Sequence, residues 1–213
     1  FHMDEPIIVA LQAKLGAEKI LTGEAVKERY CHIWQMHEPM NAKAVILPKS
    51  TQDVSDTLKI CYKYQQPTVV HGGLTNLVGG TKTNANEIAI STEHMNLIEE
   101  VDEKSRSMTV QAGVILENIQ TAAKEKGLLF PLNFGAKGSA QIGGIISTNA
   151  GGLRVFRYGM TRNLVLGLET VLADGTIVSS MKKIIKDNSA YDLKHLFIGS
   201  EGTLGVISKA VLK

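Results

Sequence analysis

The chain has 213 residues, of which 44% are hydrophobic and 21% are charged, as in ordinary globular proteins of one or two domains. Its 23 Lys and Arg nearly balance its 21 Asp and Glu, and no basic block offers a footprint for nucleic acid. No apolar run approaches the roughly 18 residues of a membrane-spanning helix, and no signal peptide is recognisable. We therefore expect a soluble protein, cytoplasmic, or located in the mitochondrial matrix if the source is eukaryotic.

The histidines and cysteines do not have the spacing of a metal site. Cys31 and Cys61 form no C-x-x-C pattern. His32 and His37 are five residues apart, which does not align them on one helical face. We expect two reduced thiols, with Cys61 in the core, and no metal.

The first elements predict a helical segment followed by a strand. Residues 5–15 predict a short helix that Gly16 ends. Residues 44–47 predict a strand that Pro48 ends. Residues 1–40 are therefore expected to form an N-terminal helical segment.

A β-α-β unit is predicted next. Residues 50–53 resemble a helix-capping signal, and the apolar residues after them recur at helical spacing. Residues 68–70 then predict a second strand, and the crossover should be right-handed. The apolar positions of this helix are Val54, Leu58, Cys61 and Tyr62.

A glycine-rich loop, HGGLTNLVGG at residues 71–80, follows the second strand. Glycine adopts positive φ without penalty and lets another molecule approach the main chain closely. The loop also lies at the carboxyl end of a strand, where open α/β sheets bind ligands. It leads to a strand at residues 87–91 instead of a helix, which excludes a Rossmann turn and a P-loop.

The second half of the chain predicts a mixed unit with mostly antiparallel strands. Residues 97–101 and 108–112 predict paired strands around a charged turn. Residues 114–126 predict a helix, with Gly127 as its C-cap.

A hairpin and a last strand are predicted near the carboxyl end. Residues 164–180 predict the hairpin, in which Asp174-Gly175 suits a type I′ turn. Residues 204–212 predict the last strand.

Three more glycine-rich segments share the character of the loop at residues 71–80. They are residues 135–152, 157–159 and 199–207. Each segment alone is most simply interpreted as a turn. Together they can offer many main-chain N–H donors to one long anionic ligand without a cluster of lysine or arginine.

In this order, VVHGGLTNLVGG, FPLNFGAKGSAQIGG, TNAGGLR, RYG, VLGLE and LFIGSEGTLG resemble the FAD-binding domain of vanillyl-alcohol-oxidase-type (PCMH-type) flavoproteins. The resemblance covers about residues 40–213 and is strongest to the branch of D-2-hydroxyglutarate dehydrogenase, D-lactate dehydrogenase and glycolate oxidase subunits. It implies FAD as the cofactor and an α+β fold. The fold would comprise a small α/β subdomain at residues 41–96 and a larger, mostly antiparallel α+β subdomain at residues 97–213.

The resemblance also implies which segments contact FAD. The loop at residues 71–80 would wrap the pyrophosphate, and residues 135–152 would line the flavin and the ribityl-diphosphate. Residues 157–159 would lie near the isoalloxazine, and residues 201–207 near the adenine and ribose or the ring edge. We also expect Gly73 and Gly143 to lack a side chain so that FAD can approach. The implied cofactor-binding residues are His71, Gly72, Gly73, Leu74, Thr75, Asn76, Leu77, Gly79, Gly80, Pro131, Gly135, Gly138, Ser139, Ile142, Gly143, Gly144, Thr148, Asn149, Gly151, Gly152, Arg157, Tyr158, Gly159, Glu201, Gly202, Val206 and Ile207.

Several positions depart from the resembled family or leave an alternative open. Leu74 and Asn76 stand where relatives commonly carry glycine, so Leu74 is expected to point away from FAD. Asn133 stands where aspartate is usual. Members that attach FAD covalently often use a histidine in this loop; the matching position holds Thr75, so we expect non-covalent FAD. For Arg157, an ordinary surface or ion-paired arginine is the alternative.

The function implied by the resemblance is that of a FAD-dependent oxidoreductase acting on CH–OH groups. It would oxidise a small D-2-hydroxy acid to the 2-oxo acid by hydride transfer to FAD, and an electron-transfer flavoprotein or another acceptor would take the electrons. In relatives a C-terminal domain supplies the substrate and metal ligands; we expect it to be absent here and name no catalytic residue. Two alternatives stay open: a non-catalytic nucleotide-binding or interaction module, or the cofactor domain of another FAD oxidoreductase, such as a cell-wall precursor reductase or a molybdenum hydroxylase subunit.

Overall fold

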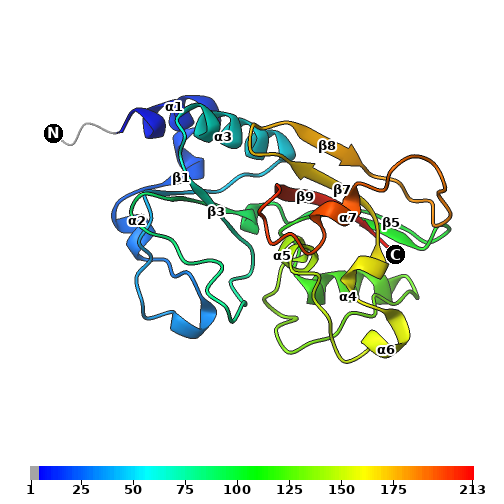
Figure 1. The fold of residues 1–213 in the computed structure, drawn as a ribbon. Coiled ribbons are helices and arrows are strands. Elements are labelled where there is room, and N and C mark those ends of the chain that lie inside the picture. Colours follow the sequence, from blue (N-terminus) through cyan, green and yellow to red (C-terminus); the bar gives the residue numbers. More distant parts are fainter. Residues whose placement is uncertain (1–4) are drawn as a thin grey trace.

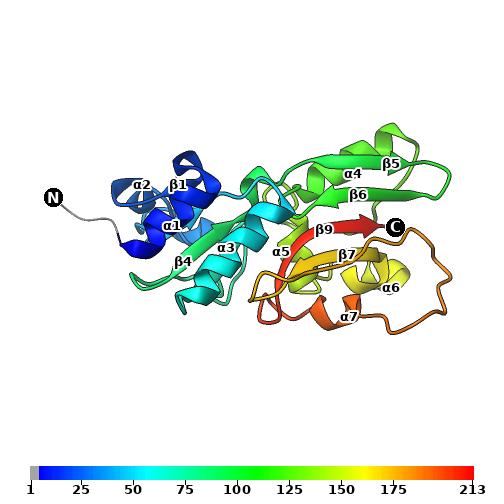
Figure 2. The same cartoon turned by 90° about the horizontal axis from the view of Figure 1, so that it is seen from above.

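The computed structural model describes residues 5–213, which form two β-sheets with helices packed against them (Figure 1). The first sheet has the strand order β1-β2-β4-β3, and the second has the order β5-β6-β9-β7-β8. The two sheets follow one another along the length of the molecule, with α1 at one end and the C-terminus towards the other (Figures 1 and 2). This mixed architecture confirms the predicted α+β class.

The elements have the following bounds. The strands are β1 Ile20–Leu21, β2 Ala44–Ile46, β3 Thr68–His71, β4 Ile88–Ser91, β5 Ile98–Asp102, β6 Ser107–Gln111, β7 Val165–Val171, β8 Ile177–Ser180 and β9 Val206–Leu212. The α-helices are α1 Pro6–Leu15, α2 Glu24–Lys27, α3 Thr51–Lys63, α4 Leu116–Glu125, α5 Ile142–Ser147, α6 Val155–Tyr158 and α7 Lys194–Phe197. Short 3-10 helices cover Ala17–Lys19, Ile33–Gln35, Thr92–His94 and Thr161–Leu164. None of the helices within residues 5–213 is both long and apolar enough to cross a membrane.

The first sheet contains the predicted β-α-β unit. β2 and β3 both pair in parallel with β4, which lies between them, and β1 adds an antiparallel edge. α1 and α3 pack together, and their apolar residues form one buried cluster with β2 and β4, including Leu11, Ile46, Cys61 and Ile88. Cys61 therefore lies in the core, as predicted, and burial raises the pKa of its thiol to about 12.

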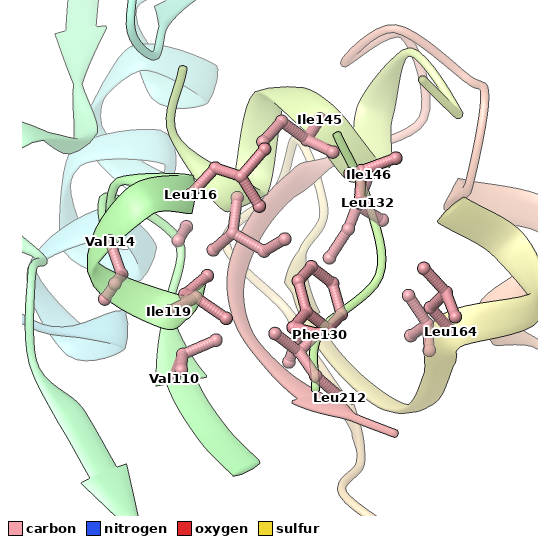
Figure 3. Close-up of a cluster of buried hydrophobic side chains, with 14 of the residues drawn as sticks. Val110, Val114, Leu116, Ile119, Phe130, Leu132, Ile145, Ile146, Leu164 and Leu212 are labelled. Carbon is pink, nitrogen blue, oxygen red and sulfur yellow. The ribbon is translucent and has the colours of Figure 1, made fainter. Parts of the chain in front are cut away.

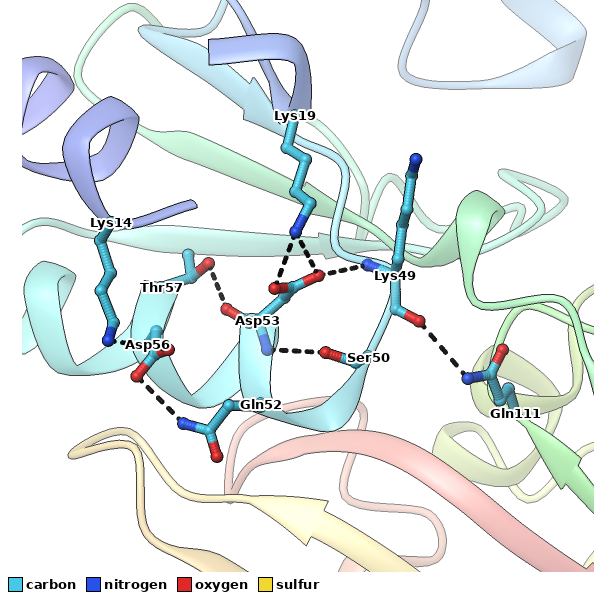
Figure 4. A network of polar contacts seen from close by, with 9 residues as sticks. All are labelled: Lys14, Lys19, Lys49, Ser50, Gln52, Asp53, Asp56, Thr57 and Gln111. Atoms are coloured by element: carbon cyan, nitrogen blue, oxygen red, sulfur yellow. Dashed lines mark hydrogen bonds and ion pairs between the residues drawn. The ribbon is translucent and has the colours of Figure 1, made fainter. Parts of the chain in front are cut away.

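The start of α3 matches the capping signal in the sequence (Figure 4). The Ser50 hydroxyl accepts a hydrogen bond from the Asp53 N–H at 3.1 Å. The Asp53 carboxylate in turn accepts from both Lys19 Nζ and the Lys49 N–H, at 3.0 and 2.9 Å. These contacts fix the first turn of α3 against the chain that enters it.

α3 also contacts the second sheet. Ser55 Oγ donates to the Gly175 carbonyl at 2.6 Å, and Thr51 Oγ1 donates to Glu169 of β7 at 2.5 Å. The buried apolar residues of α3 accordingly belong to two clusters: Cys61 lies in the one with α1, and Val54 and Leu58 lie in one that reaches the second sheet. The prediction that Tyr62 belongs to the apolar face of this helix is wrong, because Tyr62 is 64% exposed.

The second sheet is antiparallel and carries the largest core of the protein (Figure 3). Phe130, Ile119 and Leu164 lie in this core between the sheet and the segments that cover it (Figure 3). α4 and α5 cover one face of the sheet (Figure 1). Gly127 follows α4 with a φ of +68°, as the sequence predicts for a residue that ends a helix.

The turn between β7 and β8 differs from the prediction. A type I′ turn needs positive φ at both central residues, but of the Asp174-Gly175 pair only Gly175 has one, at +84°. The Gly175 N–H instead donates to Leu172 O, and the Leu172 N–H donates to Thr176 O, both at 2.8 Å. The hairpin therefore has a longer loop in which the glycine comes after the tight turn.

Candidate functional site

A cavity of about 470 Å³ lies where the loop after β3 meets α5 and the start of β9. β3 contributes Val70, α5 contributes Gly144, and β9 contributes Val206. Three of the four glycine-rich segments thus come together around one space. The sequence predicted that all four segments share one long ligand, but the segment at residues 157–159 does not line this cavity.

The loop at residues 73–77 presents a row of free main-chain donors. Within residues 5–213, the main-chain N–H groups of these five residues donate to no acceptor. Unsatisfied N–H groups in a concave loop bind anions without any cationic side chain. Glu201 is the one charged residue among the described residues that line the cavity, so a bound anion would be held mainly by main-chain dipoles.

Leu74 has the conformation that a glycine would adopt more easily. Its φ is +55°, in the left-handed region, at a position where the resembled family commonly carries glycine. Its carbonyl accepts a hydrogen bond from the Ile33 N–H at 3.1 Å. Leu74 also belongs to the cavity lining, and the expectation that its side chain points away from the cofactor stays a prediction.

His71 stands behind the loop and not in the cavity. It is 2% exposed, and its Nε2 lies 2.8 Å from the Thr81 carbonyl. A carbonyl can only accept, so Nε2 carries the proton. Burial lowers the pKa of His71 to about 4, which keeps the ring neutral near pH 7. The ring therefore closes the base of the loop as a neutral donor.

An ion pair flanks His71. Arg29 makes two hydrogen bonds to the Glu93 carboxylate, at 3.3 and 2.5 Å. Burial by itself would raise the pKa of Glu93, but the Arg29 hydrogen bond and charge outweigh it and hold that pKa below its usual value. Ser91 Oγ also donates to Glu93, at 2.9 Å. The pair ties the segment before β2 to the 3-10 helix that follows β4.

At two of the glycines, neighbouring protein atoms leave no room for a side chain. A Cβ on Gly73 would lie 2.1 Å from Ser139 O, and one on Gly143 would lie 2.7 Å from the Ala112 Cβ. The Gly143 N–H is also taken, since it donates to Ala112 O at 2.8 Å. We expected glycine at these two positions so that FAD could approach the main chain. That reason is wrong, because protein atoms already fill the space that a Cβ would occupy.

Two other glycines border open space. A Cβ on Gly80 or on Gly144 would meet no protein atom within 4 Å, and both residues line the cavity. Gly144 lies in the first turn of α5 and is exposed. At these positions a side chain would occupy the space of a ligand and not that of the protein.

The segment before β9 is fastened to α5. The Glu201 N–H donates to Ser147 O at 2.9 Å, and the Gly199 N–H donates to Ile146 O at 3.1 Å. Glu201 and Gly202 have φ values of +53° and +79°, so the chain turns sharply there before it enters β9. This turn places both residues in the cavity wall.

The structure divides the residues predicted to bind the cofactor into two groups. Those that line the cavity are Gly72, Gly73, Leu74, Thr75, Asn76, Leu77, Gly80, Gly143, Gly144, Thr148, Glu201, Gly202, Val206 and Ile207. Those outside its lining are His71, Gly79, Pro131, Gly135, Gly138, Ser139, Ile142, Asn149, Gly151, Gly152, Arg157, Tyr158 and Gly159.

Sequence reasoning missed other lining residues. They are Val70, Val78, Thr81, Thr92, Phe134, Ala140, Gln141, Ile145, Ser147, Ala150 and Gly205. Seven of them already lie inside the segments expected to contact FAD, although they were not named one by one: Val78, Ala140, Gln141, Ile145, Ser147, Ala150 and Gly205. Val70, Thr81 and Phe134 lie one position outside those segments. Thr92 carried no such signal; its hydroxyl donates to Gln141 Oε1 at 2.7 Å, across the junction of the two sheets.

Pro131, Arg157 and Tyr158 line a different cavity, of about 630 Å³. It lies beside α4 and the ends of β6 and β9, with Phe130 and Leu212 in its wall. The Arg157 guanidinium lies 5.4 Å from the centre of the Tyr158 ring. The assignment of these three residues to the flavin stays a prediction.

The residues around the first cavity fit the expected FAD. Free N–H donors suit a diphosphate, and the bare walls at Gly80 and Gly144 leave room for a cofactor against the main chain. Val70, Phe134 and Ile207 supply apolar surface for rings. Among residues 5–213, no group of three or more His, Cys, Asp and Glu could hold a metal ion.

Known proteins resemble this chain in sequence and in fold. A family model described as FAD binding domain matches residues 42–180. The mitochondrial D-2-hydroxyglutarate dehydrogenase of Arabidopsis thaliana is 44% identical over 92% of the chain, and that of Bos taurus is 47% identical over 79%. The D-2-hydroxyglutarate dehydrogenase of Xanthomonas citri is 39% identical over 99% of the chain. The chain spans 35%, 31% and 45% of these relatives, respectively.

Solved structures share the fold at low sequence identity. Alkyldihydroxyacetonephosphate synthase aligns with a TM-score of 0.84 and 20% identity, covering 100% of this chain and 41% of that one. A variant of Phl p 4, a glucose dehydrogenase, aligns with a TM-score of 0.83 and 16% identity, covering 98% and 44%. The predicted FAD-binding fold and cofactor are thereby confirmed, and the chain belongs to the FAD binding domain family.

Proposed function

We propose that this chain is the FAD-binding part of a flavin-dependent dehydrogenase that oxidises a D-2-hydroxy acid to the 2-oxo acid. The similarity to proteins named D-2-hydroxyglutarate dehydrogenase carries this proposal, at 39–48% identity over most of the chain. Another relative is named a putative D-lactate dehydrogenase, so the substrate class is better supported than any single acid. The branch of glycolate oxidase subunits gains no separate support.

The role of this chain is to bind and orient FAD. When bound, FAD supplies the acceptor for the hydride from C2 of the hydroxy acid. The N–H groups of residues 73–77 would hold the diphosphate, and the cavity wall formed by α5 and the start of β9 would receive the rest of the cofactor. The predicted division at residues 41–96 and 97–213 would place the cofactor along the junction of two subdomains.

In our proposal, the groups that bind and deprotonate the substrate lie outside these 213 residues. Glu201 is the one titratable residue with a carboxylate, imidazole or amine among those that line the described cavity, and no arginine there could hold a substrate carboxylate. A base that removes the hydroxyl proton and groups that bind the carboxylate are both required. They would come from the remainder of a longer polypeptide.

We further propose a mitochondrial location and an external electron acceptor. Many of the similar relatives carry the word mitochondrial in their names, which favours the mitochondrial alternative over the cytoplasmic one for a eukaryotic source. An electron-transfer flavoprotein is one acceptor that could reoxidise the flavin.

Anaerobic bleaching of the bound flavin tests the proposal. The 213-residue chain is loaded with FAD and mixed with D-2-hydroxyglutarate or D-lactate, in parallel with a full-length polypeptide that contains it. We expect the full-length protein to bleach at about 1 s⁻¹ or faster and the chain alone to remain yellow. Bleaching of the isolated chain at that rate would mean that it carries its own base. A full-length protein that no D-2-hydroxy acid bleaches would contradict the proposed activity, and a chain that takes up no flavin would favour a non-catalytic module.

A further inference from the structure

The loop that carries the free N–H groups is fastened to a segment that precedes β2. We call residues 29–33 the strap. The Ile33 N–H of the strap donates to Leu74 O at 3.1 Å, and the Thr81 hydroxyl donates to the Cys31 carbonyl of the strap at 2.6 Å. The strap thus contacts the loop near its middle and at its end.

Thr81 links these contacts to the loop itself. Its hydroxyl accepts from Asn76 Nδ2 at 2.7 Å, while Asn76 Oδ1 accepts from the Gly80 N–H at 3.2 Å. Its carbonyl accepts from His71 Nε2. One threonine therefore joins both ends of the loop and the strap.

The strap is itself held firmly. Arg29 is paired with Glu93 through two hydrogen bonds, and the Arg29 carbonyl accepts from the Met40 N–H at 2.7 Å. His32 is 7% exposed, and its Nδ1 accepts from the Trp34 N–H at 3.0 Å. The strap is thus held to the rest of the chain at several points.

The loop needs such a support. Its N–H groups at residues 73–77 have no acceptor within the described chain, and Leu74 holds a left-handed conformation that a leucine adopts at a cost. Without outside contacts, these residues would lose their arrangement and would have to be ordered when an anion binds. A site that is ordered beforehand binds more tightly, because the ordering cost is not paid on binding.

We propose that the strap is a positioning element for the cofactor loop, acting through the Ile33 N–H and the Thr81 hydroxyl, and that it sets how tightly the chain holds FAD. The strap lies before residue 42, where the match to the family model begins. The inference rests on the cofactor site described above but not on the identity of the substrate.

The Ile33 contact can be removed by one substitution that the backbone permits. Ile33 is the first residue of a 3-10 helix, and His32 before it is extended, with φ −155° and ψ 132°. Proline suits both conditions, so Ile33→Pro deletes the N–H without forcing a new conformation. Ile33→Ala, which loses the side chain but keeps the N–H, is the matched reference. We expect Ile33→Pro to raise the FAD dissociation constant roughly tenfold above that of Ile33→Ala.

The Thr81 contact provides an independent test. Thr81→Val keeps the shape but loses the hydroxyl, and Thr81→Ser restores the hydroxyl. Thr121→Val is the control, because its hydroxyl donates to Glu117 O on the exposed face of α4. We expect roughly tenfold weaker FAD binding for Thr81→Val. Thr81→Ser should recover most of the affinity, and Thr121→Val should match the parent chain.

The measurement is a flavin fluorescence titration of each variant, with circular dichroism melts of the same samples without flavin. Equal affinities for Ile33→Pro and Ile33→Ala, or a Thr81→Ser variant as weak as Thr81→Val, would overturn the proposal. If Ile33→Pro fails to fold, the comparison of Thr81→Val with Thr81→Ser can still overturn the proposal, because a Thr81 hydroxyl that does not affect FAD affinity cannot link the strap to the site. A parent chain that binds no FAD would overturn the cofactor site as well, whereas a loss of substrate oxidation alone would concern only the proposed activity.

Discussion

Gly73 and Ser139 touch through their main chains: a Cβ on Gly73 would lie 2.1 Å from the Ser139 carbonyl oxygen. We predict that Gly73→Ala lowers the free energy of unfolding by about 2 kcal/mol, since the backbone must move to admit the methyl group. Urea unfolding measures this. Gly72→Ala is the control, because its Cβ would make an ordinary 3.8 Å contact with Gln141. Equal stability of the two variants would contradict the packing role of Gly73.

Gly144→Ala should weaken FAD binding without lowering the stability of the chain. The new Cβ meets no protein atom within 4 Å, and alanine is favoured over glycine inside a helix by about 1 kcal/mol, so the chain without flavin should melt no lower than the parent. The methyl group occupies cavity space, and we expect FAD to bind roughly tenfold more weakly. A flavin titration measures the loss of affinity, and a thermal melt of the chain without flavin measures its stability. Unchanged affinity would remove α5 from the cofactor site.

His71 makes stability depend on pH. Its pKa is lowered from 6.5 to about 4 in the folded chain, so the unfolded chain binds more protons between these values. Stability from this residue is present above pH 6.5 and is lost as the pH falls towards 4, by up to about 3 kcal/mol. His71→Gln can keep a donor for Thr81 O but does not titrate. We expect its urea stability to fall less between pH 7 and 4.5 than that of the parent.

Arg29 and Glu93 are the charged groups beside His71, and both remain in His71→Gln. Their contribution to the pH dependence therefore cancels in the comparison. Parallel curves for the two proteins over this range would show that the buried histidine is not the source of the acid sensitivity.

FAD should leave the denatured chain completely. Thr75 stands at the loop position where covalent relatives often carry a histidine, and His71 is buried behind the loop with its Nε2–H donated to Thr81 O. We predict that the intact mass after acid denaturation equals that of the polypeptide, with the flavin recovered in the supernatant. A mass increased by that of FAD would identify a covalent link.

The sequence was sufficient where the determinants are local. Ser50 caps α3 as predicted, because its hydroxyl bonds to the Asp53 N–H three residues on. The apolar alternation and turn residues likewise located β5 and β6, which pair as predicted. The glycine loop after β3 was recognisable as a candidate ligand loop because it combines several glycines with the end of a strand, and the structure places it in the wall of a cavity.

The rest depends on contacts between distant segments. α5 begins Ile142-Gly143-Gly144, a poor helix former by propensity, and it forms because Ile142, Ile145 and Ile146 are buried in the core. The sequence could not show that Gly73 and Gly143 are packed against protein whereas Gly80 and Gly144 border open space. Only the fold shows which added Cβ would meet protein atoms. The loop at Asp174-Gly175 also makes a contact that the sequence could not show, since Gly175 O accepts a hydrogen bond from Ser55 of α3.

The position of α3 between the two sheets has a consequence for cooperativity. Val54 and Leu58 of α3 form one cluster with Val206 of the second sheet, and Val70 of the first sheet packs against it. Val70 and Val206 also line the cavity to which we assign the cofactor. A cofactor bound in this cavity would therefore contact residues from both sheets that already share a core. Amide hydrogen exchange in β3 and β9 should slow together when FAD is added, as one opening unit.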